Sequence, residues 1–496
     1  MRFFEILIFL HLFAAFVVLF LKIKGRHLRI FYLIGSVVLL SCHLVLEGAR
    51  WQMYPVYLIS LLVFLIFLRS IFVSEGNRNA SPSRTKRVMR YTGISLAFLL
   101  LLFSLIPPVI LPVFKINEPS GPLKVGCTTI YFWDTTRMDV FSNDPNAYRE
   151  LSVRVWYPAD PEKDMQRLSY MKEDEAGYMS QFIIGPKFLL SHFNLVKTHS
   201  YENAPPRAES YPVILYSPSG DMVQNTSVFQ ELASHGYVVF SVGHPYWNAF
   251  YYDHSGQAVP FDKNNDYYQA MWEEETSDTV NQVKELITVE RDLDTKRMLQ
   301  QKLNLIMPLE VADIKLWAED LSFLLDQIES GDPSFGRLLD LMDVSRVGVI
   351  GFSKGGAAAG QFAVTDSRCR AGINLSGFMF GDVVDSGLEI PFMILENKEE
   401  WCQDCQPICE VLYEDSKSDA YMVRIEGARH GNFSDWSLVG KFLQLSGVIG
   451  PINGSRCLEI QKNYILSFFD RYLKGIESPL LTAFHPDYPE VQFNSR

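Results

Sequence analysis

The chain has 496 residues, 48% hydrophobic and 21% charged, which excludes a disordered protein and leaves room for at least two folding units. Its formal net charge of −12 is unevenly divided: residues 1–115 hold 13 Lys and Arg against 3 Asp and Glu, and the remainder holds 32 against 54. Because the acidic remainder would repel phosphate groups, we expect no nucleic-acid binding.

Four long apolar runs stand in the basic N-terminal part, at Phe3–Leu21, Ile30–Leu46, Tyr57–Val73 and Ile94–Phe114. Each is close to the roughly 20 residues that an α-helix needs to cross a bilayer. A cleaved signal peptide would explain the first run alone, but three more runs follow it. We therefore predict a transmembrane region of four helices over residues 1–115.

The basic residues between these runs predict their orientation. The first and third connections are rich in Lys and Arg, whereas the second has only Arg50 beside Glu47. Connections rich in Lys and Arg usually face the cytoplasm. The N-terminus and everything after Phe114 would then lie outside the cytoplasm, so we predict a multi-pass membrane protein with an extracytoplasmic domain.

Six cysteines follow the membrane region: Cys127, Cys369, Cys402, Cys405, Cys409 and Cys457. An exported domain permits disulfides. The spacing of the three central cysteines also resembles a zinc site, but a fourth ligand is not apparent. We expect disulfides or structural cysteines, and neither a metal nor a cofactor.

After a linker at Lys115–Pro122, short β-rich stretches alternate with helical ones, which predicts an α/β fold with a mainly parallel, doubly wound sheet. Strands are predicted at Leu151–Tyr157, Val213–Ser217, Tyr237–Val242, Val347–Ile350, Ala371–Leu375, Phe392–Leu395 and Tyr421–Ile425. Helices are predicted at Phe229–His235, Glu310–Gln327 and Ala357–Val364. The domain spans residues 116–480, and a C-terminal tail follows at 481–496.

An acidic segment without glycine, Glu273–Met307, interrupts this alternation and is typical of helix. We interpret about residues 253–309 as a helical insertion. Such an insertion is either a lid over a site or a solvated excursion on the surface.

Gly351–Gly355 has the pattern G-x-S-x-G between a predicted strand and a helix of small residues. Glycine at the flanking positions permits a strained turn that exposes the hydroxyl of Ser353, so we predict this serine as a nucleophile. The N–H of Lys354, at the start of the helix, is a candidate donor to an oxyanion. We expect the Lys354 side chain itself to be solvated. A structural glycine turn is the alternative.

A serine hydroxyl needs a neighbouring base. His430 follows the last predicted strand, Tyr421–Ile425, where α/β hydrolases carry their histidine, so we predict it as the general base. Gly220 lies in the turn after an early strand and is the candidate second oxyanion donor. An ordinary strand-to-helix turn explains Gly220 equally well.

Several segments in the same order resemble one family, the platelet-activating factor acetylhydrolases of the plasma and intracellular type-II kind, with their bacterial dienelactone-hydrolase-like relatives. These segments are Gly121–Cys127, Leu232–Tyr237, Gly243–Pro245, Gly351–Gly356 and His430–Asp435. The resemblance spans roughly Gly121 to Leu473. It implies an α/β-hydrolase fold and metal-independent hydrolysis of lipid or short-acyl esters.

The sequence departs from this family at one important place. The family carries its triad aspartate just after the strand that corresponds to Ala371–Leu375, and this chain has Ser376 there. We choose Glu396 as the acid, because it directly follows the next predicted strand, where many other α/β hydrolases carry theirs. Glu399, Asp382 and Ser376 remain alternatives.

The predicted function is therefore a membrane-anchored serine ester hydrolase. His430 takes the proton of Ser353, Ser353 attacks the ester carbonyl, and water releases the acyl group. Its expected partners are a lipid or small-molecule ester and the bilayer, and no oligomeric state follows from the sequence. The competing interpretation is a non-catalytic membrane receptor or scaffold, motivated by Ser376 and by four spans where one would anchor.

Overall fold

The structure is a computed structural model that describes residues 1–23, 25–72, 83–142, 144, 146–183, 185–397 and 406–496. Glu399, Cys402 and Cys405 therefore lie outside the described residues. The chain divides into two compact units. The helical unit comprises Met1–Phe114 with Ser191–Val196 and Val439–Phe442, and the sheet unit comprises Lys115–Leu190, Lys197–Leu438 and Leu443–Arg496.

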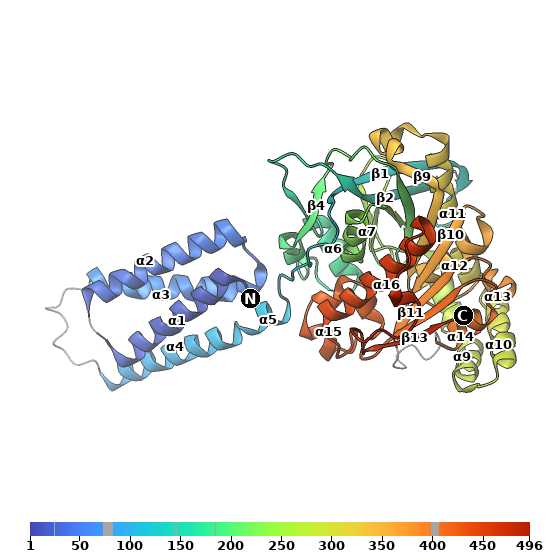
Figure 1. Ribbon diagram of the computed structural model, residues 1–496. Helices are drawn as coiled ribbons and strands as arrows, with labels where there is room; N and C mark the ends of the chain where they lie inside the picture. Colours follow the sequence, from blue (N-terminus) through green and yellow to red (C-terminus); the bar gives the residue numbers. More distant parts are fainter. Residues whose placement is uncertain (24, 73–82, 143, 145, 184, 398–405) are drawn as a thin grey trace. The chain divides into compact units, whose positions relative to one another are not determined.

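The helical unit is built from apolar helices (Figure 1). They are α1 (Phe3–Leu21), α2 (Arg26–Cys42), the π-helical turn η1 (His43–Glu47), η2 (Trp51–Met53), α3 (Tyr54–Phe72), α4 (Arg84–Phe103), α5 (Ile106–Ile110) and η4 (Ser191–Leu195). Among the described residues, four helical stretches are long and apolar enough to cross a membrane, as the four apolar runs predict; that they span one stays a prediction.

The last of these helices begins ten residues earlier than predicted. α4 starts at Arg84, and the Ser83 hydroxyl accepts a hydrogen bond from the Lys86 N–H at 3.4 Å. The hydropathy pattern missed this first part because its basic side chains are exposed. Lys and Arg are good helix formers, so polar turns can continue an apolar helix.

The sheet unit contains one large sheet. Its strands are β1 (Lys124–Met138), β2 (Tyr148–Ala159), β3 (Arg167–Ser169), β4 (Lys197–Glu202), β5 (Tyr211–Ser217), β6 (Val238–Gly243), β9 (Met342–Phe352), β10 (Cys369–Leu375), β11 (Phe392–Asn397), β12 (Ala420–Ile425) and β13 (Val491–Ser495). Within the described residues the order is β13-β12-β11-β10-β9-β5-β6-β2-β1-β4-β3. The six neighbouring strands β12, β11, β10, β9, β5 and β6 are all parallel to one another, which confirms the predicted sheet.

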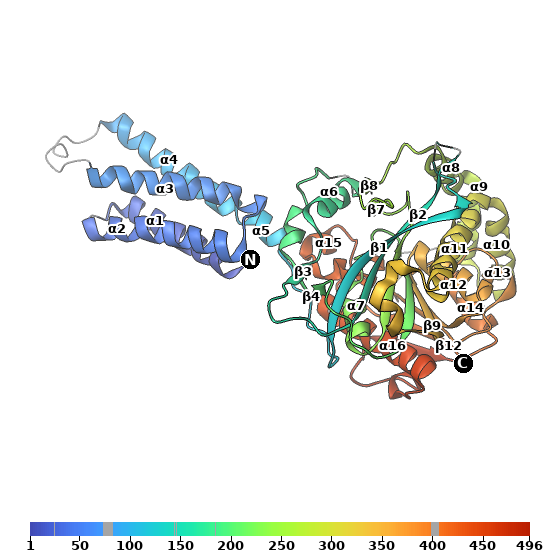
Figure 2. The ribbon, with the colours of Figure 1, turned by 90° about the horizontal axis from the view of Figure 1, so that it is seen from above.

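Helices cover both faces of this sheet (Figures 1 and 2). The main ones are α6 (Glu173–Phe182), α7 (Thr226–Ser234), α11 (Pro308–Ser330), α12 (Lys354–Thr365), α14 (Gln406–Asp415) and α16 (Gly454–Lys474). Shorter ones are η5 (Pro333–Leu341), α13 (Val383–Ser386), η6 (His430–Phe433), η7 (Asp435–Leu438) and η8 (Pro479–Leu481). A further short helix, α15 (Lys441–Leu445), is divided between the two units. α7 packs with α16, and α11 packs with α12, on opposite faces.

The predicted insertion, about residues 253–309, contains one strand and three helices, β8 (Ala258–Pro260), α8 (Asp266–Glu275), α9 (Asp278–Val289) and α10 (Leu293–Ile306). β8 forms a hairpin with β7 (Phe250–Tyr252), which directly precedes the predicted segment. α11 follows the insertion and buries the expected apolar stripe, in which Ile314, Leu321 and Leu324 are fully buried. This stripe belongs to the main hydrophobic core.

Two features differ from the sequence-based expectations. The segment predicted as a C-terminal tail forms an edge strand, because β13 pairs antiparallel with β12, with Tyr421 opposite Ser495. Only Val491 is buried in β13, so the sequence of this strand lacks the apolar pattern from which a strand is predicted. Among the described cysteines of the sheet unit no disulfide forms. Burial raises the pKa of the Cys127 and Cys457 thiols to about 12, as suits structural cysteines.

Candidate active site

Ser353 stands in a sharp turn between β9 and α12. Its backbone has φ 56° and ψ −125°, a left-handed region that costs a non-glycine residue about 1–3 kcal/mol. The Ser353 N–H donates to the Leu375 carbonyl oxygen at 3.0 Å, and the side chain is half-buried. The surrounding strands thus hold the strained turn that the G-x-S-x-G pattern predicts.

The glycines beside this turn leave room for backbone and side-chain atoms at the ends of neighbouring strands. A Cβ on Gly355 would lie 1.9 Å from the Ser217 carbonyl oxygen, at the end of β5. A Cβ on Gly356 would lie 2.2 Å from Asn374 Oδ1, at the end of β10. Neither position can therefore carry a side chain without moving the turn.

Gly355→Ala should consequently destabilise the protein and slow it. Overpacking of this kind typically costs about 1–3 kcal/mol. Thermal unfolding and ester turnover measure the two effects. Gly177→Ala in α6 is the matched control, because its Cβ would meet atoms only at 3.8 Å or beyond. An unchanged melting temperature in Gly355→Ala would contradict the close packing.

His430 begins η6, in the turn region after β12. Its ring stacks on the Phe352 ring, with centroids 4.8 Å apart and planes inclined by 22°. Its Nδ1 lies 3.1 Å from the hydroxyl oxygen of Ser376, which follows β10. Burial lowers the pKa of His430 to about 4, although the contact with Ser376 acts in the opposite direction. The imidazole is therefore neutral at pH 7, as a general base requires.

Phe352 connects the two residues. It precedes Ser353 in the sequence, and its ring stacks on the ring of His430. Within the described residues Ser353 Oγ has no hydrogen-bond partner. Hydrogen bonds of this kind often tighten only with substrate bound, so the proton transfer to His430 stays a prediction.

Glu396, the chosen acid, does not contact His430. It lies opposite Arg424 in the register of β11 and β12, and its carboxylate accepts a hydrogen bond from Arg424 Nε at 2.7 Å. Burial raises its pKa to about 7. Asp382 instead pairs with Lys315 at 2.7 Å. Of the candidate third members in the described residues, only Ser376 contacts the imidazole.

The two candidate oxyanion donors differ in their surroundings. Lys354 is the first residue of α12, so its N–H has no acceptor within the helix. The Gly220 N–H donates to Gln224 Oε1 at 3.1 Å, and Gln224 Nε2 in turn donates to the Tyr216 hydroxyl at 2.8 Å. The Gly220 N–H therefore already has an acceptor, the side-chain carbonyl oxygen of Gln224.

The prediction that the Lys354 side chain is solvated is wrong. Its ammonium is buried between two carboxylates of α11, 2.9 Å from Glu310 and 2.7 Å from Asp313. It also lies 3.8 Å from the centre of the Trp247 ring. The sequence could not show this pairing, because the two carboxylates precede the lysine by more than 40 residues.

Hydrogen bonds fasten the His430 segment to the turn after β5, which the sequence did not reveal. Asn225 Nδ2 donates to the Phe433 carbonyl oxygen at 2.8 Å. The Asp435 N–H donates to the Gln224 carbonyl oxygen at 2.7 Å, and the Asp435 carboxylate accepts from the Ser227 N–H. The segment bearing the base is therefore held against the segment bearing Gly220.

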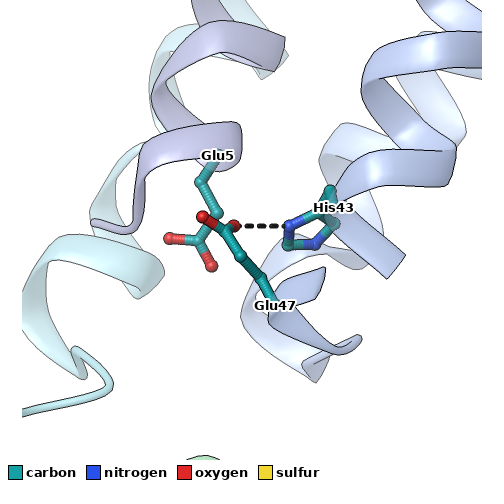
Figure 3. A group of neighbouring side chains, drawn as sticks. All are labelled: Glu5, His43 and Glu47. Atoms are coloured by element: carbon teal, nitrogen blue, oxygen red, sulfur yellow. Dashed lines mark hydrogen bonds and ion pairs between the residues drawn. The ribbon is translucent and has the colours of Figure 1, made fainter. Parts of the chain in front are cut away.

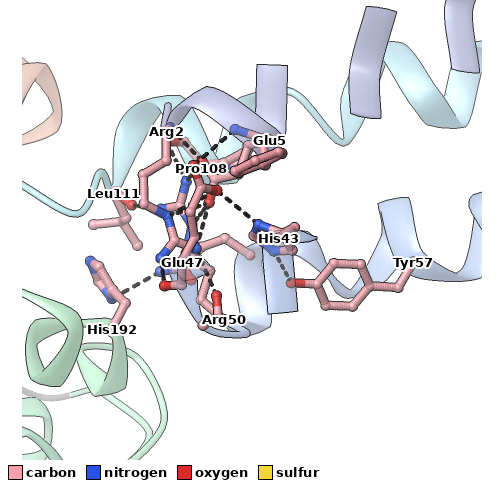
Figure 4. A network of polar contacts seen from close by, with 12 residues as sticks. Arg2, Glu5, His43, Glu47, Arg50, Tyr57, Pro108, Leu111 and His192 are labelled. Atoms are coloured by element: carbon pink, nitrogen blue, oxygen red, sulfur yellow. Dashed lines mark hydrogen bonds and ion pairs between the residues drawn. The ribbon is translucent and has the colours of Figure 1, made fainter. Parts of the chain in front are cut away.

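One group of described residues could offer ligands to a metal ion: Glu5, His43 and Glu47 of the helical unit, whose ligand atoms lie within 4.8 Å of one another (Figure 3). His43 Nδ1 already bonds to Glu47 at 2.9 Å, and His43 Nε2 lies 2.6 Å from the Tyr57 hydroxyl. The carboxylate of Glu5 receives two hydrogen bonds of 2.7 Å from the Arg50 guanidinium (Figure 4).

Other donors complete this network. Arg2 also bonds to Glu5, at 2.9 Å from its Nε, and the Phe4 N–H donates to Glu47 at 2.8 Å. Two guanidinium groups therefore balance two carboxylates, and each candidate ligand atom has a protein partner. The residues suit an ion-pair network better than a cation site.

Comparisons with known proteins indicate the family and the fold of the chain. A family model described as platelet-activating factor acetylhydrolase, isoform II, matches residues 111–477. The platelet-activating factor acetylhydrolase of Cavia porcellus is 25% identical over 379 residues, which cover 72% of this chain and 78% of that protein. A probable 1-alkyl-2-acetylglycerophosphocholine esterase of Arthroderma benhamiae is 24% identical over 419 residues, covering 77% and 94%.

Among solved structures, a ferulic acid esterase from Streptomyces cinnamoneus superposes with a TM-score of 0.60 at 24% identity. The match covers 77% of this chain and 99% of the esterase. At this identity the likeness concerns the fold, which is the α/β-hydrolase fold, preceded here by the four membrane-length helices.

Proposed function

Because the chain belongs to the family of platelet-activating factor acetylhydrolase, isoform II, and is thus a serine ester hydrolase, we propose that it cleaves lipid or short-acyl esters at a membrane, with Ser353 as nucleophile and His430 as base. The observation that carries the assignment of residues is the strained turn at Ser353, whose neighbour Phe352 stacks on the His430 ring.

The proposed reaction begins when Nε2 of His430 accepts the proton of Ser353 Oγ, which attacks the ester carbonyl carbon. The N–H of Lys354 stabilises the resulting oxyanion. Gly220 is the second donor, with the oxyanion taking the place of Gln224 Oε1 on its N–H. His430 then protonates the leaving alcohol, and water hydrolyses the acyl-enzyme by the same steps.

Ser376 takes the position of the acid in this proposal. If Nδ1–H donates to the Ser376 hydroxyl, Nε2 keeps its lone pair for the nucleophile. The hydroxyl is neutral, however, so it cannot stabilise the imidazolium as a carboxylate does. We therefore expect a correctly oriented but slow triad.

The four membrane-length helices hold the sheet unit at a bilayer in this proposal, on the extracytoplasmic side according to the distribution of Lys and Arg. Anchoring raises the local concentration of the enzyme at lipid esters.

A fluorophosphonate probe tests the function on the full-length chain in detergent. We expect one label per chain, on the peptide that contains Ser353, and no label on Ser353→Ala. The control is Ser367→Ala, which removes an exposed serine just after α12 and should label like the wild type.

A second candidate, a receptor or scaffold with a hydrolase fold, is favoured by one observation: among the described residues no carboxylate contacts His430. Folded wild-type protein that takes no label and hydrolyses no ester, from acetyl to long acyl chains, would establish this candidate instead.

A further inference from the structure

α11 also buries three carboxylates and a tryptophan, besides its apolar residues. Glu310, Asp313, Trp317 and Asp320 stand three or four residues apart, so they share one side of the helix, and all four are buried. Buried carboxylates are costly unless each has a charged or hydrogen-bonded partner. The partners of these three acids lead to the two segments that carry the proposed oxyanion donors.

The first pair of acids holds Lys354. Glu310 and Asp313 lie 2.9 Å and 2.7 Å from its ammonium, and the Trp247 ring lies on the ammonium at 3.8 Å. Lys354 supplies the proposed donor N–H from its own backbone. A side chain fixed at its far end by two ion pairs restricts the backbone at its near end.

The third acid holds the end of β5 through a histidine. Asp320 lies 2.9 Å from His244 Nδ1, and His244 Nε2 lies 2.8 Å from the Ser217 hydroxyl oxygen. Burial lowers the pKa of His244, so the imidazole is neutral. It therefore donates from Nδ1 to Asp320 and accepts at Nε2 from Ser217.

This Ser217–His244–Asp320 relay is closed to solvent and packed on further side chains. The Arg149 guanidinium makes two hydrogen bonds of 2.7 Å to Asp320, and the Trp317 ring stacks on His244 at 4.1 Å with planes inclined by 9°. Because every member of the relay is fully buried, the Ser217 hydroxyl cannot meet a substrate. The relay can only fix the position of Ser217.

Ser217 is the last residue of β5 before the turn that contains Gly220. It lies opposite Gly351 in the register of β5 and β9, and its carbonyl oxygen fills the space beside Gly355. The Ser217 turn and the Lys354 turn therefore touch, and acids from the same face of α11 hold both.

We propose that Glu310, Asp313 and Asp320 are positioning residues that set the separation of the two oxyanion donors, Lys354 N–H and Gly220 N–H. The proposal rests on the function proposed above. The insertion supports the same arrangement, because the Glu274 carboxylate at the end of α8 accepts hydrogen bonds from the Leu309 and Glu310 N–H groups at 3.1 Å and 3.0 Å. These acids of α11 thus affect the reaction through the positions of the two N–H donors, without contacting the substrate.

Lys354→Met tests the proposal, because it removes the ammonium and keeps the backbone N–H. We expect kcat to fall about 10- to 100-fold with KM within about 3-fold of wild type, as for the displacement of an oxyanion donor. Affinity for a trifluoromethyl ketone, which forms a tetrahedral oxyanion on the enzyme, should fall as much as kcat. Affinity for the matching methyl ketone, which stays trigonal, should not change.

Lys462→Met is the matched control, since it removes another largely buried ion pair, 2.7 Å from Glu231, between α16 and α7. It should keep kcat and both ketone affinities. If Lys354→Met does not fold, Asp313→Asn, which keeps the side-chain volume, gives the same comparison with the same expected pattern.

Three outcomes distinguish a failure of the positioning role from a failure of the proposed hydrolase function. Wild-type kcat and ketone affinity in both variants would overturn the positioning role, and so would an equal loss of both ketones, which indicates general damage to the site. A wild-type protein that binds neither ketone and hydrolyses no ester would overturn the proposed function itself.

Discussion

Replacing Ser376 by aspartate is expected to raise kcat/KM for ester hydrolysis by about 10²- to 10⁴-fold, the range set by the roughly 10⁴-fold loss when a triad carboxylate is removed. The Ser376 hydroxyl oxygen already lies 3.1 Å from His430 Nδ1, so a carboxylate at this position would reach the same nitrogen. It would stabilise the imidazolium that forms as Ser353 attacks. Hydrolysis of an activated acetyl ester at pH 8 measures the gain.

The pH profile should change with it. The pKa of His430 is lowered to about 4, so the wild type loses its base only as the pH falls through about 4. A carboxylate favours the protonated imidazole and raises this pKa. The acid limb of kcat/KM in Ser376→Asp should therefore move to higher pH, even though its plateau is higher.

Ser376→Asn is the control for this experiment, because asparagine matches aspartate in size and carries no charge. It should give neither the gain nor the shift. Equal activity of the aspartate and asparagine variants, with normal fluorophosphonate labelling of both, would show that a charge beside Nδ1 is not what the site lacks.

Arg50→Met is expected to lower the free energy of unfolding of the helical unit by about 3 kcal/mol, the lower end of the usual cost of removing one partner of a buried ion pair, because Arg2 stays bonded to Glu5. Glu5 is fully buried and takes both of its shortest hydrogen bonds from Arg50. The same guanidinium donates to the Leu111 and Pro108 carbonyl oxygens at 2.8 Å and 3.2 Å, at the end of the last membrane-length helix. Unfolding of the full-length chain in mixed detergent micelles measures the loss.

Arg69→Met removes an exposed guanidinium from the last turn of α3 and should leave this stability unchanged. The same preparation tests the nature of the network. A chelator should not alter the wild-type unfolding curve, because the acids are paired with arginines. One equivalent of a transition metal that survives purification and whose removal destabilises the protein would replace the ion-pair account.

The sequence was sufficient to predict those elements that depend only on neighbouring residues in the chain. The strands that lead into Ser353 and His430 are short apolar runs, and the glycines beside Ser353 are needed by the turn itself. These features predict the fold and place both residues near the carboxyl ends of parallel strands.

The sequence did not reveal which side chains meet across strands. Glu396 follows a predicted strand as the acid of many α/β hydrolases does, yet its neighbour in the sheet is Arg424, which its carboxylate contacts. Lys354 looked like a surface lysine because its two acidic partners stand in another helix. Pairings between distant segments depend on register and packing, which no local pattern records.

The antiparallel pairing of β13 with β12 covers the edge of β12. Without it, β12 would present its free N–H and C=O groups along Tyr421, Met422 and Val423, a template on which a second molecule could add a strand. β12 also leads directly to His430. An affinity tag or a deletion at this terminus would therefore bear on solubility and on the base together, and engineering is better confined to other surfaces.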